Sequence, residues 1–248
     1  MIAKCCWCGA PFVRVDETYW CSTPACAQRQ ADFALAINGK FWYVPLPKQI
    51  EMETAPVRYL LGGGAAGVAK SHMARFGLYR RALAIDNFEG LILRKTWNEL
   101  EKHHLRLMER EARALQANGV AVEYARTDRE IRFTRPSGAV SIIEGGHMED
   151  PKDVEKYLGR ERDAIVPDEG VTFDPQKLLE LSTRARSTKP AVEAFARVLW
   201  QRPTGPIPGG GAVFWVLSNP GGPSASMLRD FFIDKTPDAE EYPQLYEL

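Results

Sequence analysis

The chain has 248 residues, 45% hydrophobic and 26% charged, which suits one large globular core with a small added module and excludes a disordered chain. Lysine plus arginine and aspartate plus glutamate number 32 each, so the net charge of zero does not indicate a nucleic-acid partner, although a local basic patch would suffice to bind one. No run of about 18 apolar residues is present, so we expect no membrane-spanning helix and no membrane partner.

The N-terminal segment contains all five cysteines, between Cys5 and Cys26. Cys5 and Cys8 form a C-x-x-C pair followed by glycine, and Cys21 and Cys26 form a second pair. Two thiolate pairs in tight turns can hold zinc tetrahedrally, and the alternating run FVRVDETYW between them predicts a short β-hairpin. We therefore predict a zinc ribbon with Cys5, Cys8, Cys21 and Cys26 as ligands. Its zinc is structural, because four thiolates leave no open position for catalysis.

Two alternatives remain open for this cluster. Cys6 is a spare sulfur next to Cys5 and can replace it as a ligand. A disulfide-linked N-terminus is the second alternative, but the sequence lacks the basic and then apolar layout of a signal peptide. We therefore expect a reducing compartment, in which clustered cysteines act as metal ligands before disulfides.

The segment after the ribbon is expected to connect it to the main domain. Residues 29–38 are predicted to be helical, and YVPLPKQIEMETAP, residues 43–56, is rich in proline and predicted to be an extended linker. We place the zinc-ribbon module at residues 1–40 and the main domain at 41–248.

From Val57 onward, apolar runs of strand length alternate with helical patterns. Such alternation predicts an α/β domain with a mostly parallel sheet flanked by helices. One helical pattern places His104 together with Trp97, Leu100 and Leu107 at a spacing close to 3.6 residues. The predicted strands are 57–61, 90–96, 163–168 and 212–218, the predicted helices are 70–84, 97–115, 175–184 and 190–200, and an inserted β-hairpin is predicted at 130–134 and 139–144.

A phosphate-binding loop is predicted in YLLGGGAAGVAKS, between the first strand and the first helix of this domain. A Walker A loop reads G-x-x-x-x-G-K-[ST]; Gly64, Lys70 and Ser71 fit this pattern, whereas Ala69 replaces the second glycine. Small residues let backbone N–H groups surround phosphates, the lysine reaches the β- and γ-phosphate oxygens, and the hydroxyl binds Mg²⁺. The predicted nucleotide-binding residues are Gly62, Gly63, Gly64, Ala65, Ala66, Gly67, Val68, Ala69, Lys70 and Ser71. The alternative is a glycine-rich turn without a ligand.

Polar residues at the ends of two later strands extend this site. The run AIVPDEG contains Asp168, predicted to bind Mg²⁺ with Ser71, and Glu169, predicted to be the general base that activates water. Pro167 is unusual there, because proline cannot donate to a sheet ladder. The run VFWVLSN ends in Asn219, whose amide can contact the γ-phosphate or the attacking water. Solvated turns are the alternative for both segments. The predicted catalytic residues are Lys70, Asp168, Glu169 and Asn219.

Together these segments resemble the ATPase part of the large terminase subunit of tailed bacteriophages, the motor that pumps DNA into procapsids. GGAAGVAKS is similar to the family's GGAAGGGKS form, with Val68 and Ala69 replacing two glycines, and Pro167 replaces an apolar or small residue. GLILRKTWNELEKHH resembles the family's second strand and following helix. DAIVPDEG, ELSTRARS and LSNPGGPSASMLRDFF resemble its Walker B, arginine-containing and coupling motifs. The resemblance covers roughly residues 45–235.

This resemblance implies an ASCE-type P-loop ATPase that uses ATP and Mg²⁺, forms a homo-oligomeric ring and translocates double-stranded DNA in the host cytoplasm. The implied partners are the portal protein and the small terminase subunit. The family's nuclease domain has no counterpart after the coupling motif, so we expect no nuclease activity from this chain. A helicase-like nucleic-acid ATPase and a non-catalytic zinc-ribbon assembly module are the alternative functions.

A transition-state arginine is also expected, because negative charge develops on the γ-phosphate during hydrolysis. Arg94, Arg184 and Arg186 are the candidates, and a surface or fold-supporting role is the alternative for each. His103 and His104 lie on a charged helix and are not expected to be ligands.

Overall fold

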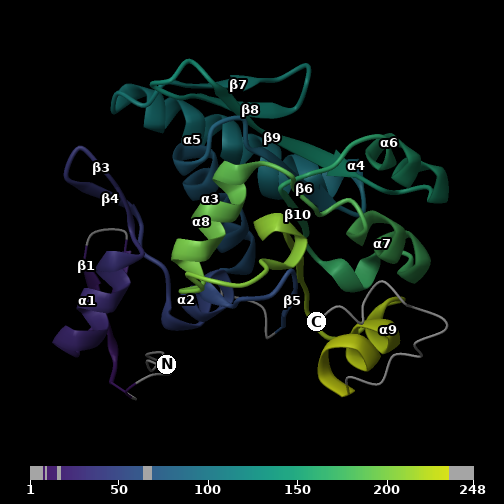
Figure 1. Cartoon of the computed structure of the whole chain (residues 1–248), viewed down its shortest axis with the longest axis horizontal. Coiled ribbons are helices and arrows are strands. Elements are labelled where there is room, and N and C mark those ends of the chain that lie inside the picture. Colours follow the sequence, from purple (N-terminus) through teal and green to yellow (C-terminus); the bar gives the residue numbers. More distant parts are fainter. Residues whose placement is uncertain (1–7, 9, 16–17, 64–68, 235–248) are drawn as a thin grey trace. The chain divides into compact units, whose positions relative to one another are not determined.

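The computed structural model describes residues 8, 10–15, 18–63 and 69–234 (Figure 1). The chain divides into two compact units, Met1–Ala55 and Pro56–Leu248. This division falls later in the chain than the domain boundary that we expect after residue 40.

The first unit contains the hairpin predicted for the ribbon. β1 (Phe12–Val15) pairs antiparallel with β2 (Thr18–Cys21), which confirms the hairpin. α1 (Pro24–Asp32) follows, and the side chain of its buried Gln30 accepts a hydrogen bond from the backbone N–H of Cys21 at 2.7 Å. This bond ties the helix to the end of the hairpin.

The helix predicted over residues 29–38 is correct only for residues 29–32 and wrong beyond them. α1 ends at Asp32, and β3 (Leu35–Ile37) pairs antiparallel with β4 (Lys40–Tyr43) in a second hairpin. The turn residues Asn38 and Gly39 have φ of 50° and 76°. Asparagine and glycine tolerate positive φ, and an Asn-Gly pair favours a tight hairpin turn over a continuing helix.

The extended linker predicted over residues 43–56 is also wrong, because α2 (Pro47–Thr54) lies within it. Proline is favourable in the first turn of a helix, where its missing N–H has no partner to lose. The side chain of Gln49 accepts a hydrogen bond from the Leu46 N–H at 2.8 Å and caps the start of this helix.

The second unit is built on a sheet with the strand order β5-β11-β10-β6-β9-β8-β7 within the described residues. The first five strands in that order are parallel, and β8 and β7 pair antiparallel at one edge. The structure confirms the mostly parallel sheet and the inserted hairpin; β9 of that hairpin continues into the parallel part, and β7 is a strand that the sequence patterns did not predict. The strands are β5 (Tyr59–Gly62), β6 (Glu89–Arg94), β7 (Val122–Ala125), β8 (Glu130–Thr134), β9 (Val140–His147), β10 (Ala164–Pro167) and β11 (Val213–Leu217).

Helices cover both faces of this sheet. On one face, Leu91 of β6 and Phe214 of β11 share a buried core with Leu178 of α7 and Leu228 of α9. On the other face lies Trp215, because successive side chains of a strand alternate, and the guanidinium of Arg81 in α3 sits 4.4 Å from its ring centroid. The helical segments are α3 (Lys70–Ala84), α4 (Trp97–Leu100), the π-helix η1 (Glu101–Leu105), α5 (Arg106–Ala117), η2 (Pro151–Val154), α6 (Glu155–Leu158), η3 (Gly170–Thr172), α7 (Pro175–Ser182), α8 (Pro190–Leu199), η4 (Pro208–Gly211), α9 (Ala225–Arg229) and the π-helix η5 (Asp230–Asp234).

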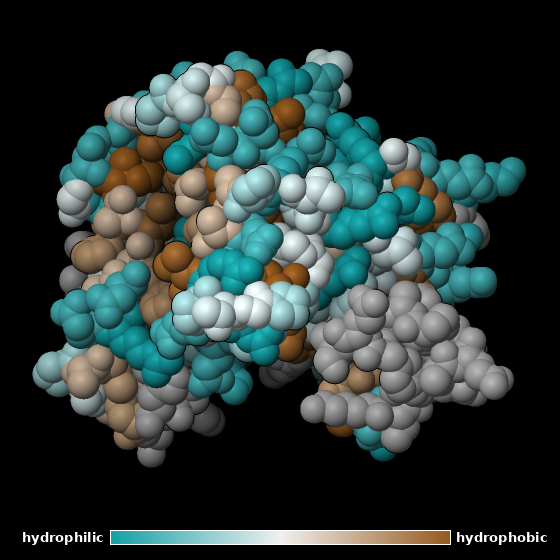
Figure 2. Space-filling view, viewed as in Figure 1, coloured by the Kyte–Doolittle hydropathy of each residue, from teal (hydrophilic) through white to brown (hydrophobic). Residues whose placement is uncertain are grey.

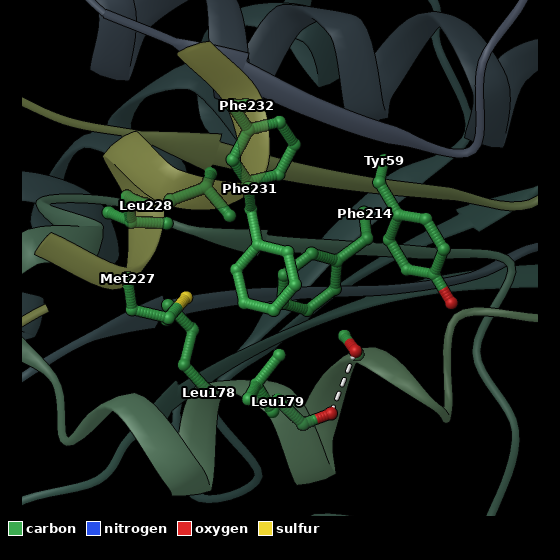
Figure 3. A pocket seen from close by; sticks show the side chains of 10 residues that line it. Tyr59, Leu178, Leu179, Phe214, Met227, Leu228, Phe231 and Phe232 are labelled. Carbon is green, nitrogen blue, oxygen red and sulfur yellow. Dashed lines mark hydrogen bonds between the residues drawn. The ribbon is translucent and has the colours of Figure 1, made fainter. Parts of the chain in front are cut away.

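A small apolar cavity of about 50 Å³ lies between β5, β11, α7 and the segment formed by α9 and η5 (Figure 3). Tyr59 and Phe214 line it from the strands, and Leu178, Met227 and Phe232 line it from the helical segments. The last described helical segment is therefore packed against the strand that leads to the predicted phosphate loop.

The surface of the described residues is mixed in character. Figure 2 shows hydrophilic residues over much of the visible face, with hydrophobic residues in separate patches. Among the described residues, no helix combines the length and the apolar character that crossing a membrane requires.

A buried ion pair joins α3 to α5. The Arg75 guanidinium donates to both carboxylate oxygens of Glu111, at 2.9 Å for the closest contact with each, and the Tyr79 hydroxyl donates to the same carboxylate at 2.7 Å. Nη1 of Arg75 also donates to the backbone oxygens of Ser71 and His103, both at 3.2 Å. One arginine thus fixes the start of α3 relative to η1.

We predict that Glu111→Ala lowers the free energy of unfolding by about 3 kcal/mol or more, because it leaves Arg75 as an unpaired buried charge. Urea unfolding measures this change. Glu161→Ala is the matched control: it breaks an exposed pair with Arg186 and should cost less than about 1 kcal/mol. Equal effects of the two substitutions would contradict the anchoring role of Arg75 and Glu111.

Candidate active site

The sheet brings three chain segments together at the carboxyl ends of its strands. Lys70 and Ser71 begin α3 after β5, Asp168 and Glu169 follow β10, and Asn219 lies just after β11. The carboxyl ends of parallel strands lie at the same edge of a sheet, and open α/β sheets bind ligands at that edge.

The five predicted residues at this edge are joined by hydrogen bonds. The Ser71 hydroxyl donates to Asp168 Oδ2 at 2.6 Å. Lys70 Nζ donates to Asn219 Oδ1 at 2.8 Å, and Asn219 Nδ2 donates to Glu169 Oε1 and Oε2 at 3.0 and 3.2 Å. A lysine, a hydroxyl, two carboxylates and an amide therefore face one another.

Asp168 is 1% exposed, and two further side chains contact the same oxygen that Ser71 contacts. Arg94, at the end of β6, donates from Nη2 to Asp168 Oδ2 at 2.7 Å. His104, in η1, places Nε2 at 2.9 Å from that oxygen. Arg94 also lies 3.3 Å from Ser71 Oγ through Nη2, and its Nη1 is 3.9 Å from Glu169 Oε1. Arg94 thus links the two acidic residues.

The protonation states follow from these contacts. Burial by itself raises the pKa of Asp168, but the hydrogen bond with His104, the positive charge of Arg94 and the Ser71 hydroxyl together lower this pKa to about 2. For His104, burial lowers the pKa and outweighs the opposing effect of Asp168. The histidine is therefore neutral at neutral pH, and Arg94 supplies the positive charge that balances Asp168.

Two residues of the site have left-handed backbone conformations. Ala69, at the position where the Walker A pattern has glycine, has φ of 55°, and Glu169 has φ of 60°. A side chain with Cβ is strained there, and such strain is found at functional sites. The left-handed backbone at this position explains why the Walker A pattern has glycine there. Ala69 adopts the same backbone conformation at a cost in strain.

The structure separates the three arginine candidates. Of the three, Arg94 contacts the residues above; the described contacts of Arg186 include an ion pair with Glu161 at 2.7 Å. No hydrogen bond or ion pair joins Arg184 or Arg186 to the site in the described part of the chain. The predictions for Gly64, Ala65, Ala66, Gly67 and Val68 fall outside the described residues, whereas Gly62 ends β5 and Gly63 follows it.

His104 is the site residue that sequence reasoning missed. The sequence predicts that His104 lies on a charged helix and is not a ligand, and gives it no role in the site; its side chain is fully buried, with Nε2 at 2.9 Å from Asp168 Oδ2. A signal was present in the sequence: His104 occupies an apolar-face position of its helical pattern. A histidine at such a position is either packed in the core or directed at a partner, and spacing alone does not distinguish the two.

The oxygen donors of this site suit Mg²⁺. A serine hydroxyl and a carboxylate are the hard ligands that this ion prefers, usually together with waters and substrate phosphates. Ser71 and Asp168, already 2.6 Å apart through Oγ and Oδ2, are the residues that would hold it.

A second candidate site lies in the first unit. The sulfur atoms of Cys8, Cys21 and Cys26 all lie within 4.8 Å of one another, with 3.4 Å between Cys8 and Cys21. Tetrahedral ligation with Zn–S bonds of about 2.3 Å places sulfurs about 3.8 Å apart, so the cluster fits zinc. The Thr23 hydroxyl is the main cause that lowers the pKa of Cys8 to about 6, which favours the thiolate. The predicted fourth ligand, Cys5, is outside the described residues.

Comparisons with known proteins identify a shared fold. No protein-family model matches the sequence, and no curated protein matches it. A large terminase from a thermophilic bacteriophage matches with a TM-score of 0.56 and 16% identity over 79% of this chain and 43% of that chain. The same terminase in complex with ADP matches with a TM-score of 0.53 and 15% identity over 76% of this chain and 43% of that chain.

These matches confirm the predicted α/β fold with a mostly parallel sheet. The matched region spans less than half of the terminase chain. The solved structures therefore show the fold of this chain.

We predict that Ala69→Gly raises the free energy of unfolding by about 1 kcal/mol, because glycine adopts positive φ without the clash of a Cβ atom. Ala114→Gly, within α5, is the control and should lower that free energy by about 1 kcal/mol. Urea unfolding of both variants measures whether each substitution raises or lowers the free energy of unfolding. A loss of stability in both would show that Ala69 is not strained.

We also predict one zinc ion per chain, measured by elemental analysis, and its loss in Cys8→Ser, because three thiolates hold zinc less tightly than four. Cys6→Ser is the control and should retain the metal if Cys5 is the fourth ligand. Metal-free wild-type protein would contradict the zinc ribbon, and loss of zinc in Cys6→Ser would assign the fourth position to Cys6.

Proposed function

We propose that this chain is a magnesium-dependent ATPase and the motor part of a machine that packages double-stranded viral DNA into procapsids. One observation carries the proposal: Lys70 is joined through Asn219 to Glu169, beside the Ser71–Asp168 pair. This is the set of groups that phosphoryl transfer to water requires. The fold shared with a large terminase supports the same assignment.

The residues at the start of α3 are the proposed phosphate-binding residues. Lys70 has to exchange its hydrogen bond with Asn219 for contacts with the β- and γ-phosphate oxygens, and backbone N–H groups at the helix N-terminus favour the same anion. Ser71 and Asp168 would hold Mg²⁺, which would supply positive charge to offset the negative charge of the phosphates.

Glu169 is the proposed general base. Its side chain is 28% exposed, so water can reach the carboxylate, unlike that of the buried Asp168. The Asn219 amide orients it, and Glu169 accepts the proton of the attacking water at a carboxylate oxygen. Arg94, 3.9 Å from Glu169, is the arginine best placed to stabilise charge that develops during hydrolysis.

The partners belong to the same proposal. We infer a homo-oligomeric ring that acts on double-stranded DNA with the portal protein and the small terminase subunit, in the host cytoplasm. The resemblance of several motifs in the same order, together with the shared fold, supports these partners. Procapsid-dependent protection of DNA from added nuclease separates a packaging motor from a helicase with the same core.

The expected results of two substitutions test the ATPase. Lys70→Ala should abolish ATP binding, measured with a fluorescent nucleotide, because it removes the cation that contacts the phosphates. Glu169→Gln should bind ATP normally and lower kcat by about 100-fold or more, because the amide cannot accept the proton.

Glu180→Gln is the control for the second substitution. Glu180 pairs with Lys177 on α7, away from the residues of the site, and its loss should leave kcat unchanged. Hydrolysis by Glu169→Gln at the wild-type rate would exclude this residue as the base.

A further inference from the structure

The proposed ATPase mechanism assigns no role to the buried contact between His104 and Asp168. We propose that His104 is a positioning residue that holds the Asp168 carboxylate in the orientation needed for Mg²⁺. This inference rests on the proposed function, and it assigns a use to a fully buried side chain on the π-helical turn η1. Short π-helical insertions in α-helices are often found at functional sites.

The chemistry of the contact fixes which atom carries the proton. An ionised carboxylate can only accept hydrogen bonds, so Nε2 of His104, 2.9 Å from Asp168 Oδ2, carries the hydrogen. Nδ1 is buried and has no hydrogen-bond partner among the described residues. A second proton at Nδ1 would be a buried donor without an acceptor, which is unfavourable. The histidine thus donates from Nε2.

The backbone around His104 is held by the same arginine that holds the start of α3. Arg75 Nη1 donates to the backbone oxygens of His103 and Ser71, and Glu111 fixes the Arg75 guanidinium. The histidine and the proposed magnesium-binding serine are therefore positioned by one buried ion pair. Such shared support is what a precise metal site requires.

Ser71, Arg94 and His104 all donate to Asp168 Oδ2, but they differ in their other contacts. Ser71 is a proposed magnesium ligand, and Arg94 also reaches toward Glu169, so both can change partners when nucleotide binds. The side chain of His104 makes no other hydrogen bond among the described residues and has no exposed surface. It is the donor that remains on Oδ2 throughout, while no side-chain hydrogen bond joins Oδ1 to any described residue. His104 thereby leaves Oδ1 available for the metal.

The test compares two substitutions at this position. His104→Leu removes the donor with little change in size, whereas His104→Gln keeps an N–H donor on a side chain of similar reach. Calorimetry measures ADP binding to each protein in Mg²⁺ and in EDTA. Loss of an outer-shell partner of a metal ligand weakens metal binding by about 10- to 100-fold. The factor by which Mg²⁺ raises the ADP affinity should therefore be about tenfold smaller in His104→Leu than in wild type. Its affinity in EDTA should match that of wild type.

Further measurements separate positioning from general damage. The free Mg²⁺ concentration for half-maximal ATP hydrolysis should rise by a similar factor in His104→Leu and return toward the wild-type value in His104→Gln. His103→Leu, which changes the exposed neighbouring histidine, should leave both readouts unchanged. If His104→Leu does not fold, His104→Asn replaces it, since its amide is too short to reach Asp168.

The outcomes are distinguishable. A wild-type Mg²⁺ response in His104→Leu or in His104→Asn overturns the inference and leaves the ATPase intact. An equal loss in His104→Gln and His104→Leu also overturns it, because the donor would then not matter. Wild-type protein that neither binds ADP nor hydrolyses ATP overturns both proposals. The tenfold loss with rescue by glutamine supports the positioning role.

Discussion

The burial of the Asp168 carboxylate is the constraint on which the rest of the site depends. A carboxylate removed from water is stable only where donors and positive charge surround it. Here a single oxygen accepts from Ser71, Arg94 and His104, which belong to the start of α3, the end of β6 and the turn η1. Three segments far apart in the sequence therefore have to meet at one atom. The order β11-β10-β6 makes this possible, because it places β10 inside the sheet with a neighbour on each side.

Much of this arrangement could be predicted from the sequence. The run VFWVL contains no polar residue, which favours a strand buried on both faces, and β11 is buried along its whole length. The polar residues that follow it and β10 then had to lie at one edge of the sheet. The Walker A pattern and the polar residues that end two predicted strands place Lys70, Ser71, Asp168, Glu169 and Asn219 in one predicted site without any knowledge of side-chain contacts.

The remaining contacts depend on how helices pack, which spacing does not encode. Arg75 and Glu111 lie on different helices, and nothing in either sequence segment identifies the other as its partner. His104 was visible as a buried position, but its partner lies across the interface between η1 and β10. Pro47 is compatible both with an extended linker and with the first turn of a helix, so the sequence around it did not predict one structure. The side chain of Gln49 caps the start of α2 and thereby favours the helix.

Asn219 holds Lys70 through its oxygen and Glu169 through its nitrogen, so one amide group joins the lysine proposed to bind phosphate to the proposed base. A phosphate that draws Lys70 to itself removes the donor from that oxygen, and the amide loses one of the two bonds that fix its orientation. Phosphate binding near Lys70 would thereby affect the contact between Asn219 and Glu169 through a single side chain. Lys70 and the proposed base therefore share one orienting residue, so a change in the position of Lys70 alters the support that Asn219 gives to Glu169.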